Sequence, residues 1–324
     1  MTCGDFPCPE KLLSNAPNNL TKEGGTCIMI MEQWVHVTIT KQRKGFLHME
    51  ALKMTELKQN AARIREGILH GTHAAASGHP GGSMSIADIM SYLYFAEMRV
   101  DPENAKWEER DRFVLSKGHA APALYATLAL RGYFPFDDMF TLRRIDSVLQ
   151  GHPDMKHVPG VDMSTGSLGQ GISAACGMAL AAKLDKKDYR VYAIVGDGES
   201  EEGQVWEALM FAAHNKLDNL CVVIDWNGLQ IDGAIDEIVS PAPYEGKVTS
   251  FGCHLVTMDA HDFNDIERAF AEAKTVKGKP TVIVAKSVKG KGVSFMENQC
   301  KWHGTAPNDE QYAKALEEIK AQEV

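Results

Sequence analysis

The sequence predicts an α/β fold, an open parallel sheet flanked by helices. Three observations support this prediction. Short apolar runs rich in β-branched residues recur along the chain, longer segments with helical spacing separate them, and polar or glycine residues follow the runs. The chain has 324 residues, 44% of them hydrophobic and 24% charged, which is enough for one or two globular domains.

The predicted strands are each too short for a helix and bounded by polar or glycine residues, so we expect them to be buried and parallel. They are Arg112–Leu115, Val191–Val195, Leu220–Ile224, His254–Met258 and Thr281–Ala285. The predicted helices that alternate with them are Gly169–Leu184, Gln204–His214 and Asp265–Lys274, with a last helix at Asp309–Ala321. In open sheets of this kind, ligands bind beyond the carboxyl ends of the strands.

The periodic pattern begins near Thr55, where Leu57, Ala61 and Ile64 recur at helical spacing. We therefore expect residues 1–53 to be an N-terminal extension, irregular or partly disordered, and residues 54–324 to form one domain. The apolar stretch at 27–39 is interrupted by polar residues and predicts neither a membrane span nor a signal peptide.

Composition excludes some classes of partner. The formal net charge is −9 and no basic stripe is present, so neither nucleic acid nor an anionic membrane surface is an expected partner. The seven cysteines are spread along the chain without a C-x-x-C pair. This distribution is typical of a reducing compartment and predicts a cytoplasmic protein.

Two oxygen-rich turns follow neighbouring predicted strands. Val191–Val195 runs into Gly196-Asp197-Gly198, and Leu220–Ile224 runs into Asp225-Trp226-Asn227-Gly228-Leu229. Parallel strand ends lie at one edge of a sheet, and carboxylate, amide and carbonyl oxygens are ligands that Mg²⁺ prefers. An isolated Gly-Asp-Gly is usually only a turn, but the second turn favours a metal site.

These two turns together resemble the thiamine diphosphate signature. The resemblance implies that the side chains of Asp197 and Asn227 and the carbonyl of Leu229 bind a divalent metal, Mg²⁺ or else Ca²⁺ or Mn²⁺. It also implies that Gly196 and Gly198 contact the cofactor.

Four histidines stand beside glycine or proline in predicted loops. They are His79 in Ser77–Gly82, His119 in Ser116–His119, His152 in Gly151–Asp154 and His303 in Trp302–Gly304. Any one of them could be a structural histidine at a turn, but four in similar settings favour a functional role.

In order, these motifs resemble those of the transketolase family, as do Thr165–Gly171 and Ile231–Gly233, and the resemblance covers about residues 55–310. It implies the diphosphate-binding (PP-domain) fold and catalytic roles for His79, His119, His152 and His303. The implied cofactor contacts are His119, Gly166, Ser167, Leu168, Gly196, Asp197, Gly198, Glu202, Asn227 and His303. Many transketolases carry proline where Ser167 stands.

Glu202 matches an acidic position that lies near the subunit interface in that family. Within Glu199–Glu202 it could equally be a solvated helix start, favoured by the helix dipole. His261 and Asp262 are ambiguous. Five further histidines match no motif and are expected in helices or at the surface: His70, His73, His157, His214 and His254.

Transketolases also need a glutamate from a pyrimidine-binding domain. Only about 17 residues follow Pro307, whereas such a domain needs on the order of 100 residues. The resemblance therefore implies a partner subunit carrying the pyrimidine-binding and C-terminal domains, in an α2β2 assembly with the cofactor at the shared surface.

The function implied is transfer of a two-carbon ketol unit from a ketose phosphate to an aldose phosphate, with thiamine diphosphate as the electron sink. Two alternatives remain open. One is the alpha subunit of a 2-oxo acid dehydrogenase, which carries Gly-Asp-Gly but lacks the Ser-Gly-His-Pro-Gly and Trp-His-Gly contexts. The other is a non-catalytic thiamine-binding module.

Overall fold

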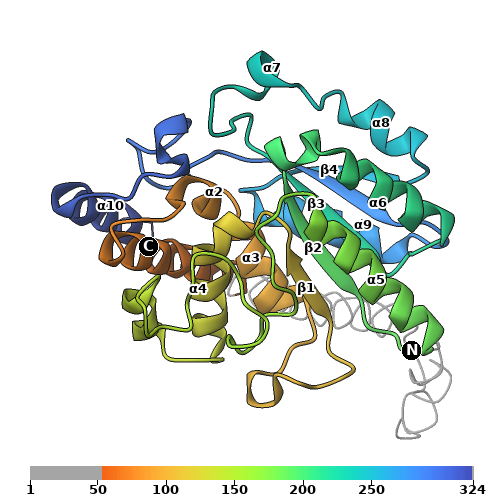
Figure 1. The fold of residues 1–324 in the computed structure, drawn as a ribbon, viewed down its shortest axis with the longest axis horizontal. Helices are drawn as coiled ribbons and strands as arrows, with labels where there is room; N and C mark the ends of the chain where they lie inside the picture. Colours follow the sequence, from red (N-terminus) through yellow and green to blue (C-terminus); the bar gives the residue numbers. More distant parts are fainter. Residues whose placement is uncertain (1–52, 323–324) are drawn as a thin grey trace, which may run out of the picture. The chain divides into compact units, whose positions relative to one another are not determined.

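The computed structural model describes residues 53–322 and contains the predicted five-stranded parallel sheet, which Figure 1 shows with its flanking helices. The strand order is β1-β2-β3-β5-β4, and every neighbouring pair is parallel. The strands are β1 Arg112–Leu115, β2 Val191–Gly196, β3 Leu220–Trp226, β4 His254–Asp259 and β5 Thr281–Lys286. All five predicted strands are confirmed, with four of them one or two residues longer at the carboxyl end.

Each face of the sheet has its own apolar core. On one face, Tyr192 and Ile194 of β2 pack with the helix over residues 53–74 and with α3 (Ala87–Tyr92), α4 (Ala121–Arg131) and α9 (Phe263–Thr275). The alternate residues Ala193 and Val195 pack on the other face. That face is covered by α5 (Gln170–Leu184), α6 (Gly203–His214) and α8 (Tyr244–Ser250), and Figure 1 shows α5 and α6 side by side over it. Strands buried on both faces explain the continuous apolar runs in the sequence.

The predicted helices α5, α6 and α9 are confirmed to within two residues at each end. The last predicted helix is α10 (Asp309–Lys320), which begins with a capping box between Asn308 and Gln311. The helix expected to begin near Thr55 already includes residue 53. Residues 1–52 lie outside the described part, so the irregular N-terminal extension and its boundary with the domain stay predictions.

Several helical segments were not predicted, and α4 shows why. Nine of its residues, from Ala121 to Ala129, are buried, so the helix lacks the polar face that produces a 3.6-residue pattern. The other segments without a sequence prediction are α2 (Pro80–Met84), α3, α7 (Ile235–Ile238), α8, the π-helix η2 (Leu93–Glu97) and the 3-10 turns η3 (Pro102–Asn104), η4 (Gly118–Ala120), η5 (Phe136–Thr141), η6 (Gly198–Glu201) and η7 (Cys300–His303).

The carboxyl ends of the strands bring chemically active residues to one edge of the sheet. Gly196, the last residue of β2, is in register with Asp225 of β3, so Asp197 and Asn227 follow at neighbouring positions. The chain after β1 supplies Lys117, and the chain after β5 supplies Lys289. Within residues 53–322, no helix has both the length and the apolar character needed to span a membrane.

Candidate active site

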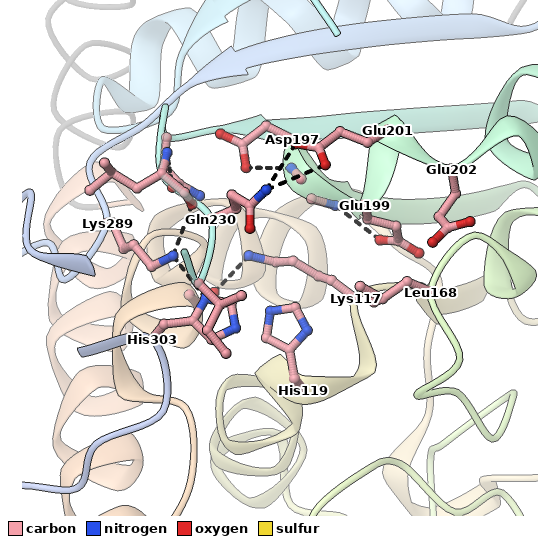
Figure 2. A pocket seen from close by; sticks show the side chains of 16 residues that line it. Lys117, His119, Leu168, Asp197, Glu199, Glu201, Glu202, Gln230, Lys289 and His303 are labelled. Atoms are coloured by element: carbon pink, nitrogen blue, oxygen red, sulfur yellow. Dashed lines mark hydrogen bonds between the residues drawn. The ribbon is translucent and has the colours of Figure 1, made fainter. Parts of the chain in front are cut away.

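A pocket lies at the carboxyl edge of the sheet, and residues from several loops converge on it (Figure 2). Its lining includes most of the residues expected from the sequence to bind cofactor or metal. The full lining is Gly82, Lys117, His119, Leu168, Gly196, Asp197, Gly198, Glu199, Glu201, Glu202, Asn227, Leu229, Gln230, Ile231, Lys289 and His303.

Asp197 joins the two oxygen-rich turns. One carboxylate oxygen accepts a hydrogen bond from the backbone N–H of Gly198 at 2.9 Å, and the other accepts from that of Gly228 at 2.6 Å. Burial and the neighbouring Asp225 carboxylate raise the pKa of Asp197 to about 6, although the two backbone donors oppose the shift. A buried carboxylate with a raised pKa is one whose charge is not fully balanced by the protein, which suits a cation site.

The orientation of Asn227 is set by Asp225. The Nδ2 group of Asn227 donates to Asp225 Oδ2 at 3.0 Å, so its Oδ1 faces the other way and accepts from the N–H of Leu229 at 3.2 Å. An ionised carboxylate accepts only, which fixes which end of the amide it meets. Asn227 therefore presents an oxygen on the Leu229 side of the turn.

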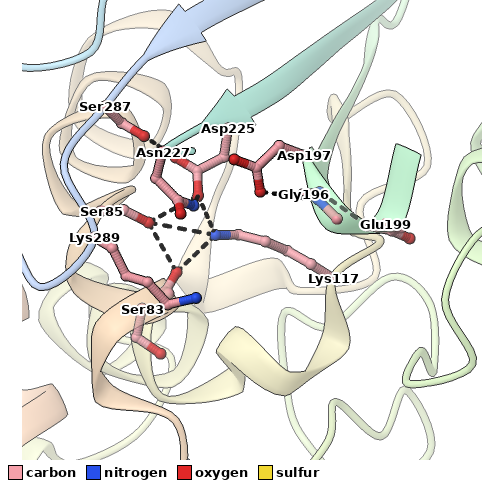
Figure 3. Close-up of polar contacts among 12 residues, drawn as sticks. Ser83, Ser85, Lys117, Gly196, Asp197, Glu199, Asp225, Asn227, Ser287 and Lys289 are labelled. Atoms are coloured by element: carbon pink, nitrogen blue, oxygen red, sulfur yellow. Dashed lines mark hydrogen bonds and ion pairs between the residues drawn. The ribbon is translucent and has the colours of Figure 1, made fainter. Parts of the chain in front are cut away.

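Asp225 is fully buried and is held by three further donors (Figure 3). Lys117 Nζ donates to Asp225 Oδ2 at 2.6 Å, Ser85 Oγ to the same oxygen at 2.8 Å, and Ser287 Oγ to Oδ1 at 2.5 Å. Burial alone would raise the pKa of Asp225, but the Lys117 ammonium and these hydrogen bonds hold it below its ordinary value. Asp225 and Lys117 were not predicted as site residues.

Lys289 is a third site residue that the sequence prediction missed. Its Nζ lies 2.9 Å from the carbonyl oxygen of Leu229 and 3.0 Å from Nδ1 of His303. Burial lowers the pKa of Lys289 to about 8, although Asp197 opposes the shift. The side chain thus places a positive charge against the carbonyl expected to bind the metal. The only sequence signal was a lysine among glycines after a strand, in Val288–Gly292.

The acidic turn Glu199–Glu202 contains one buried acid that the sequence prediction did not distinguish from its neighbours. Glu199 is 2% exposed and ties together three segments. Its carboxylate accepts from Ser116 Oγ at 2.5 Å, from the N–H of Gly169 at 2.9 Å and from the N–H of Gly196 at 3.0 Å. Glu202, by contrast, is exposed at the pocket. Which acid is buried depends on the loops that fold over it, so the local sequence does not reveal it.

Three of the four predicted histidines gather in one cluster. The ring centroids of His119 and His303 are 5.1 Å apart, and His79 lies 5.3 Å from His119 and 5.5 Å from His303. Burial, followed by nearby cationic groups, lowers the pKa of His79 to about 4 and that of His303 to about 3, and the pKa of His119 also lies well below its usual value. The cluster is therefore neutral at physiological pH.

His152 is exposed and is not one of the three rings that pack together in this cluster. It packs beside Gly166, where an added Cβ would lie 2.9 Å from the His152 ring. Leu168 lines the pocket, whereas Gly166 and Ser167 do not. Of the three residues predicted to contact the cofactor in this loop, only Leu168 therefore reaches the pocket.

The oxygens expected to bind the metal fit a hard cation. They comprise one carboxylate, one amide oxygen and one backbone carbonyl, which is a ligand set that Mg²⁺ accepts together with phosphate oxygens and water. Lys289 already places a cation against the Leu229 carbonyl. Among residues 53–322, no cluster of three or more His, Cys, Asp or Glu side chains could hold a metal ion, so a metal here would depend on this mixed set.

The ambiguous residues after β4 have structural partners. Asp262 caps α9 by accepting from the N–H of Asn264 at 2.9 Å. His261 Nδ1 lies 2.7 Å from Asp88, and its Nε2 accepts from the N–H of Val288 at 3.0 Å. Neither residue lines the pocket.

Comparison with known proteins places the chain in one family. Residues 57–321 match the family domain described as transketolase, thiamine diphosphate binding domain. The chain is 46% identical over 265 residues to a 6-deoxy-6-sulfo-D-fructose transketolase subunit of Clostridium sp. (strain MSTE9), covering 82% of this chain and 96% of the relative. It is 40% identical over 268 residues to one of the apulose-4-phosphate transketolase subunits of Phocaeicola vulgatus, covering 83% and 95%.

Among solved structures, transketolase from Leishmania mexicana superposes with a TM-score of 0.77 at 33% identity. The match covers 82% of this chain but 41% of that longer one. Fold and site together define a thiamine diphosphate-binding domain of the α/β type. The chain belongs to the transketolase family, and it is the N-terminal, diphosphate-binding part of a transketolase. These relatives do not favour the 2-oxo acid dehydrogenase or the non-catalytic alternative.

Proposed function

We propose that this chain binds thiamine diphosphate through a divalent metal and works with a separate subunit to transfer a two-carbon ketol unit from a ketose phosphate to an aldose phosphate. The observation that carries the proposal is the hydrogen bond from Gly228 N–H to Asp197, which holds the turns of Asp197 and Asn227 together at one edge of the sheet. The relatives that match over nearly their whole length are named as transketolase subunits.

Asp197, Asn227 and the carbonyl of Leu229 would bind the metal, with Mg²⁺ as the first choice and Ca²⁺ or Mn²⁺ as alternatives. Gly196 and Gly198 would contact the cofactor, because residues without a side chain let the backbone approach a diphosphate. Lys289, which lies beside Leu229 and His303, would add positive charge for the diphosphate oxygens. A metal and a lysine together would offset the negative charge of the cofactor in a chain whose net charge is −9.

When bound, thiamine diphosphate supplies the electron sink for ketol transfer. The contribution of this chain lies in its histidines. His79, His119 and His303 are neutral, so each ring can donate one hydrogen bond and accept another, as sugar hydroxyls require. His152, exposed on a separate loop, would contact substrate further out. These groups would orient the hydroxyls and move protons during the reaction.

The proposed partner is a C-terminal transketolase subunit with the pyrimidine-binding domain, joined in an α2β2 assembly. Glu202 and Leu168, which are exposed beside the pocket, would then lie near the shared surface and the cofactor, with Gly166 and Ser167 on the same loop. The other ligands would be sugar phosphates. We expect no nucleic acid or membrane partner. The free cysteines among the described residues support a cytoplasmic location, where a role in the pentose phosphate pathway is expected.

The test is to purify this chain alone and with the chain encoded beside it, and to assay ketol transfer with thiamine diphosphate and Mg²⁺. Activity of the pair, with none from either chain alone, is the expected result. Full activity from this chain alone would overturn the two-subunit proposal. Decarboxylation of a 2-oxo acid without ketol transfer would point to the dehydrogenase alternative. Tight cofactor binding without turnover would support a non-catalytic module.

A further inference from the structure

Two side chains from outside the pocket hydrogen-bond the backbone of the segment 288–291, which carries Lys289. Backbone bonds also hold this segment, from the N–H of Gly290 to the carbonyl of Gly81 at 3.0 Å and from the N–H of Asn298 to the carbonyl of Lys289 at 2.9 Å. On one side of Lys289, the N–H of Val288 donates to Nε2 of His261 at 3.0 Å. On the other side, the carbonyl of Lys291 accepts from Nε of Arg65 at 2.9 Å. His261 follows β4 and Arg65 lies in the helix over residues 53–74, so two distant elements hold one short segment.

Asp88 in α3 connects these two anchors. Its carboxylate accepts from Arg65 Nη2 at 2.5 Å and from Arg65 Nη1 at 3.1 Å, and it lies 2.7 Å from Nδ1 of His261. Asp88 is 7% exposed and Arg65 is 5% exposed. A bidentate buried pair of this kind has a well-defined geometry. Arg65, Asp88 and His261 therefore form a rigid network, which we call the anchor triad.

The tautomer of His261 follows from its two partners. Because Nε2 accepts from a backbone N–H, it carries no proton, so the proton of the neutral ring is on Nδ1 and is donated to Asp88. The carboxylate thus fixes both the orientation of the ring and the nitrogen that faces Val288. Replacing the ring would release the Val288 N–H while the Arg65–Asp88 pair could remain.

The backbone of the anchored segment is permissive at two glycines, so side-chain contacts restrict it further. Gly290 and Gly292 stand on either side of Lys291 with φ of 76° and 97°, a region that glycine enters easily. Lys289 lies in the segment and reaches two site groups, the Leu229 carbonyl at 2.9 Å and His303 Nδ1 at 3.0 Å. A shift of the Val288–Lys289 peptide by about 1 Å would break contacts of this length.

We propose that His261 is a positioning residue, which, oriented by Asp88 and Arg65, fixes the Val288 backbone and so holds the Lys289 amino group at the Leu229 carbonyl and His303. The positioning of the segment is a property of this chain alone. Its consequence for cofactor binding rests on the function proposed above. The two are tested by separate measurements.

Two substitutions each remove one of the two hydrogen bonds of His261 and keep the other. In His261→Asn the amide nitrogen can replace Nδ1 and donate to Asp88, but the side chain is too short to reach Val288. In His261→Gln the longer side chain can place its oxygen near the position of Nε2 and accept from Val288, but the bond to Asp88 is lost. The matched control is His254→Asn, which removes a histidine–carboxylate contact at 2.8 Å with Glu272 at the other end of β4.

The first measurement is amide hydrogen exchange of the full-length chain without partner or cofactor. We expect His261→Asn to speed exchange in the peptide containing Val288 and Lys289 about tenfold, His261→Gln to stay within about threefold of wild type, and His254→Asn to match wild type. Wild-type exchange of this peptide in His261→Asn would overturn the proposal. So would equal acceleration in both His261 variants.

The second measurement is the KM for thiamine diphosphate, the kcat and the Tm of the chain assembled with its partner and Mg²⁺. Loss of outer partners of a binding site typically costs about 10- to 100-fold in affinity. We expect the KM of His261→Asn to rise at least about tenfold with kcat within about twofold, and His261→Gln to restore the KM although its Tm is the lower of the two. If the KM instead rises in proportion to the loss of Tm across the variants, His261 has only a structural role and the proposal is wrong.

Activity of the wild-type pair distinguishes a failure of the proposed function from a failure of the proposed role of His261. If it shows no cofactor-dependent ketol transfer, the proposed function fails, while the exchange measurement still decides whether His261 fixes the segment. If the wild-type pair is active and His261→Asn has a normal KM, the proposed function stands and the link from His261 to the cofactor is wrong.

Discussion

The amino group of Lys117 lies 2.6 Å from a carboxylate oxygen of Asp225, and both side chains are almost completely buried. This ion pair joins the chain after β1 to the carboxyl end of β3, and the amide nitrogen of Asn227 donates to the same oxygen of Asp225. Lys117 also donates to the carbonyl of Gly82 in α2 at 2.6 Å, so it brings this short helix to the site. A buried pair of this kind positions the turn that is proposed to bind the metal.

Lys117→Met should strongly destabilise the chain, because it leaves the Asp225 carboxylate buried without its cation. Breaking a buried pair in this way costs about 3–5 kcal/mol of unfolding free energy. The double variant Lys117→Met, Asp225→Asn should recover part of that loss, since no unpaired charge remains. Urea unfolding of the full-length chain measures both values. If the loss in the double variant equals the sum of the losses in Lys117→Met and Asp225→Asn measured singly, the two groups are not coupled.

Lys289→Met should weaken cofactor binding with little change in fold. The ammonium group lies against Leu229 and His303, where it would contribute to diphosphate binding by charge-assisted hydrogen bonds worth about 1.5–3 kcal/mol. The KM for thiamine diphosphate in the assembled pair should therefore rise about 10- to 100-fold. The control is Lys301→Met, which removes an exposed lysine from the same region. An unchanged KM in Lys289→Met would contradict the assignment.

The histidine cluster should make stability dependent on pH. Burial lowers the pKa of His303 to about 3 in the folded chain, whereas the unfolded chain takes up this proton near pH 6.5. Below pH 6.5 the unfolded state thus binds more protons, and this group removes stability progressively as pH falls toward 3. Unfolding free energy measured at about pH 7 and about pH 5 should drop less in His303→Asn than in wild type. The exposed His214→Asn serves as control and should show the wild-type drop.

His79→Asn should lower kcat far more than it changes cofactor affinity. His79 lies in the cluster with His119 and His303, but it is not part of the pocket lining that includes Asp197, Asn227 and Leu229. Positioned acid–base groups contribute typically about 10²- to 10⁴-fold to a rate. We expect a loss in this range for ketol transfer by the pair, with a KM for thiamine diphosphate within about threefold of wild type. A wild-type kcat in His79→Asn would show that His79 has no catalytic role.

Much of the fold was predictable because its signals are local. The strand Leu220–Trp226 is buried on both faces and therefore reads as a continuous apolar run, and α9 has the polar and apolar faces of an amphipathic helix. The helix α4 was missed for the opposite reason, since burial on all sides removes the periodic pattern. Single-turn elements such as η6 are set by tertiary contacts.

The residues of the site likewise fall into some that the sequence predicts and some that it does not. Asp197 and Asn227 could be predicted because each directly follows a strand, and the sheet brings consecutive strand ends together. Lys289 and Glu199 could not, because their place depends on how loops fold over the pocket. Glu199 is buried only because Ser116, Gly169 and Gly196 surround its carboxylate, and nothing in the acidic run identifies it.

The most direct test of the metal-linked diphosphate site is the affinity of the assembled pair for thiamine diphosphate with Mg²⁺, compared between wild type and Asp197→Asn. The variant keeps the shape of the side chain and an oxygen that can accept from Gly228, but it removes the carboxylate charge expected to bind the metal. We predict at least about a 100-fold loss of cofactor affinity and loss of ketol transfer in a chain that remains folded. Wild-type affinity and turnover in Asp197→Asn would contradict this site.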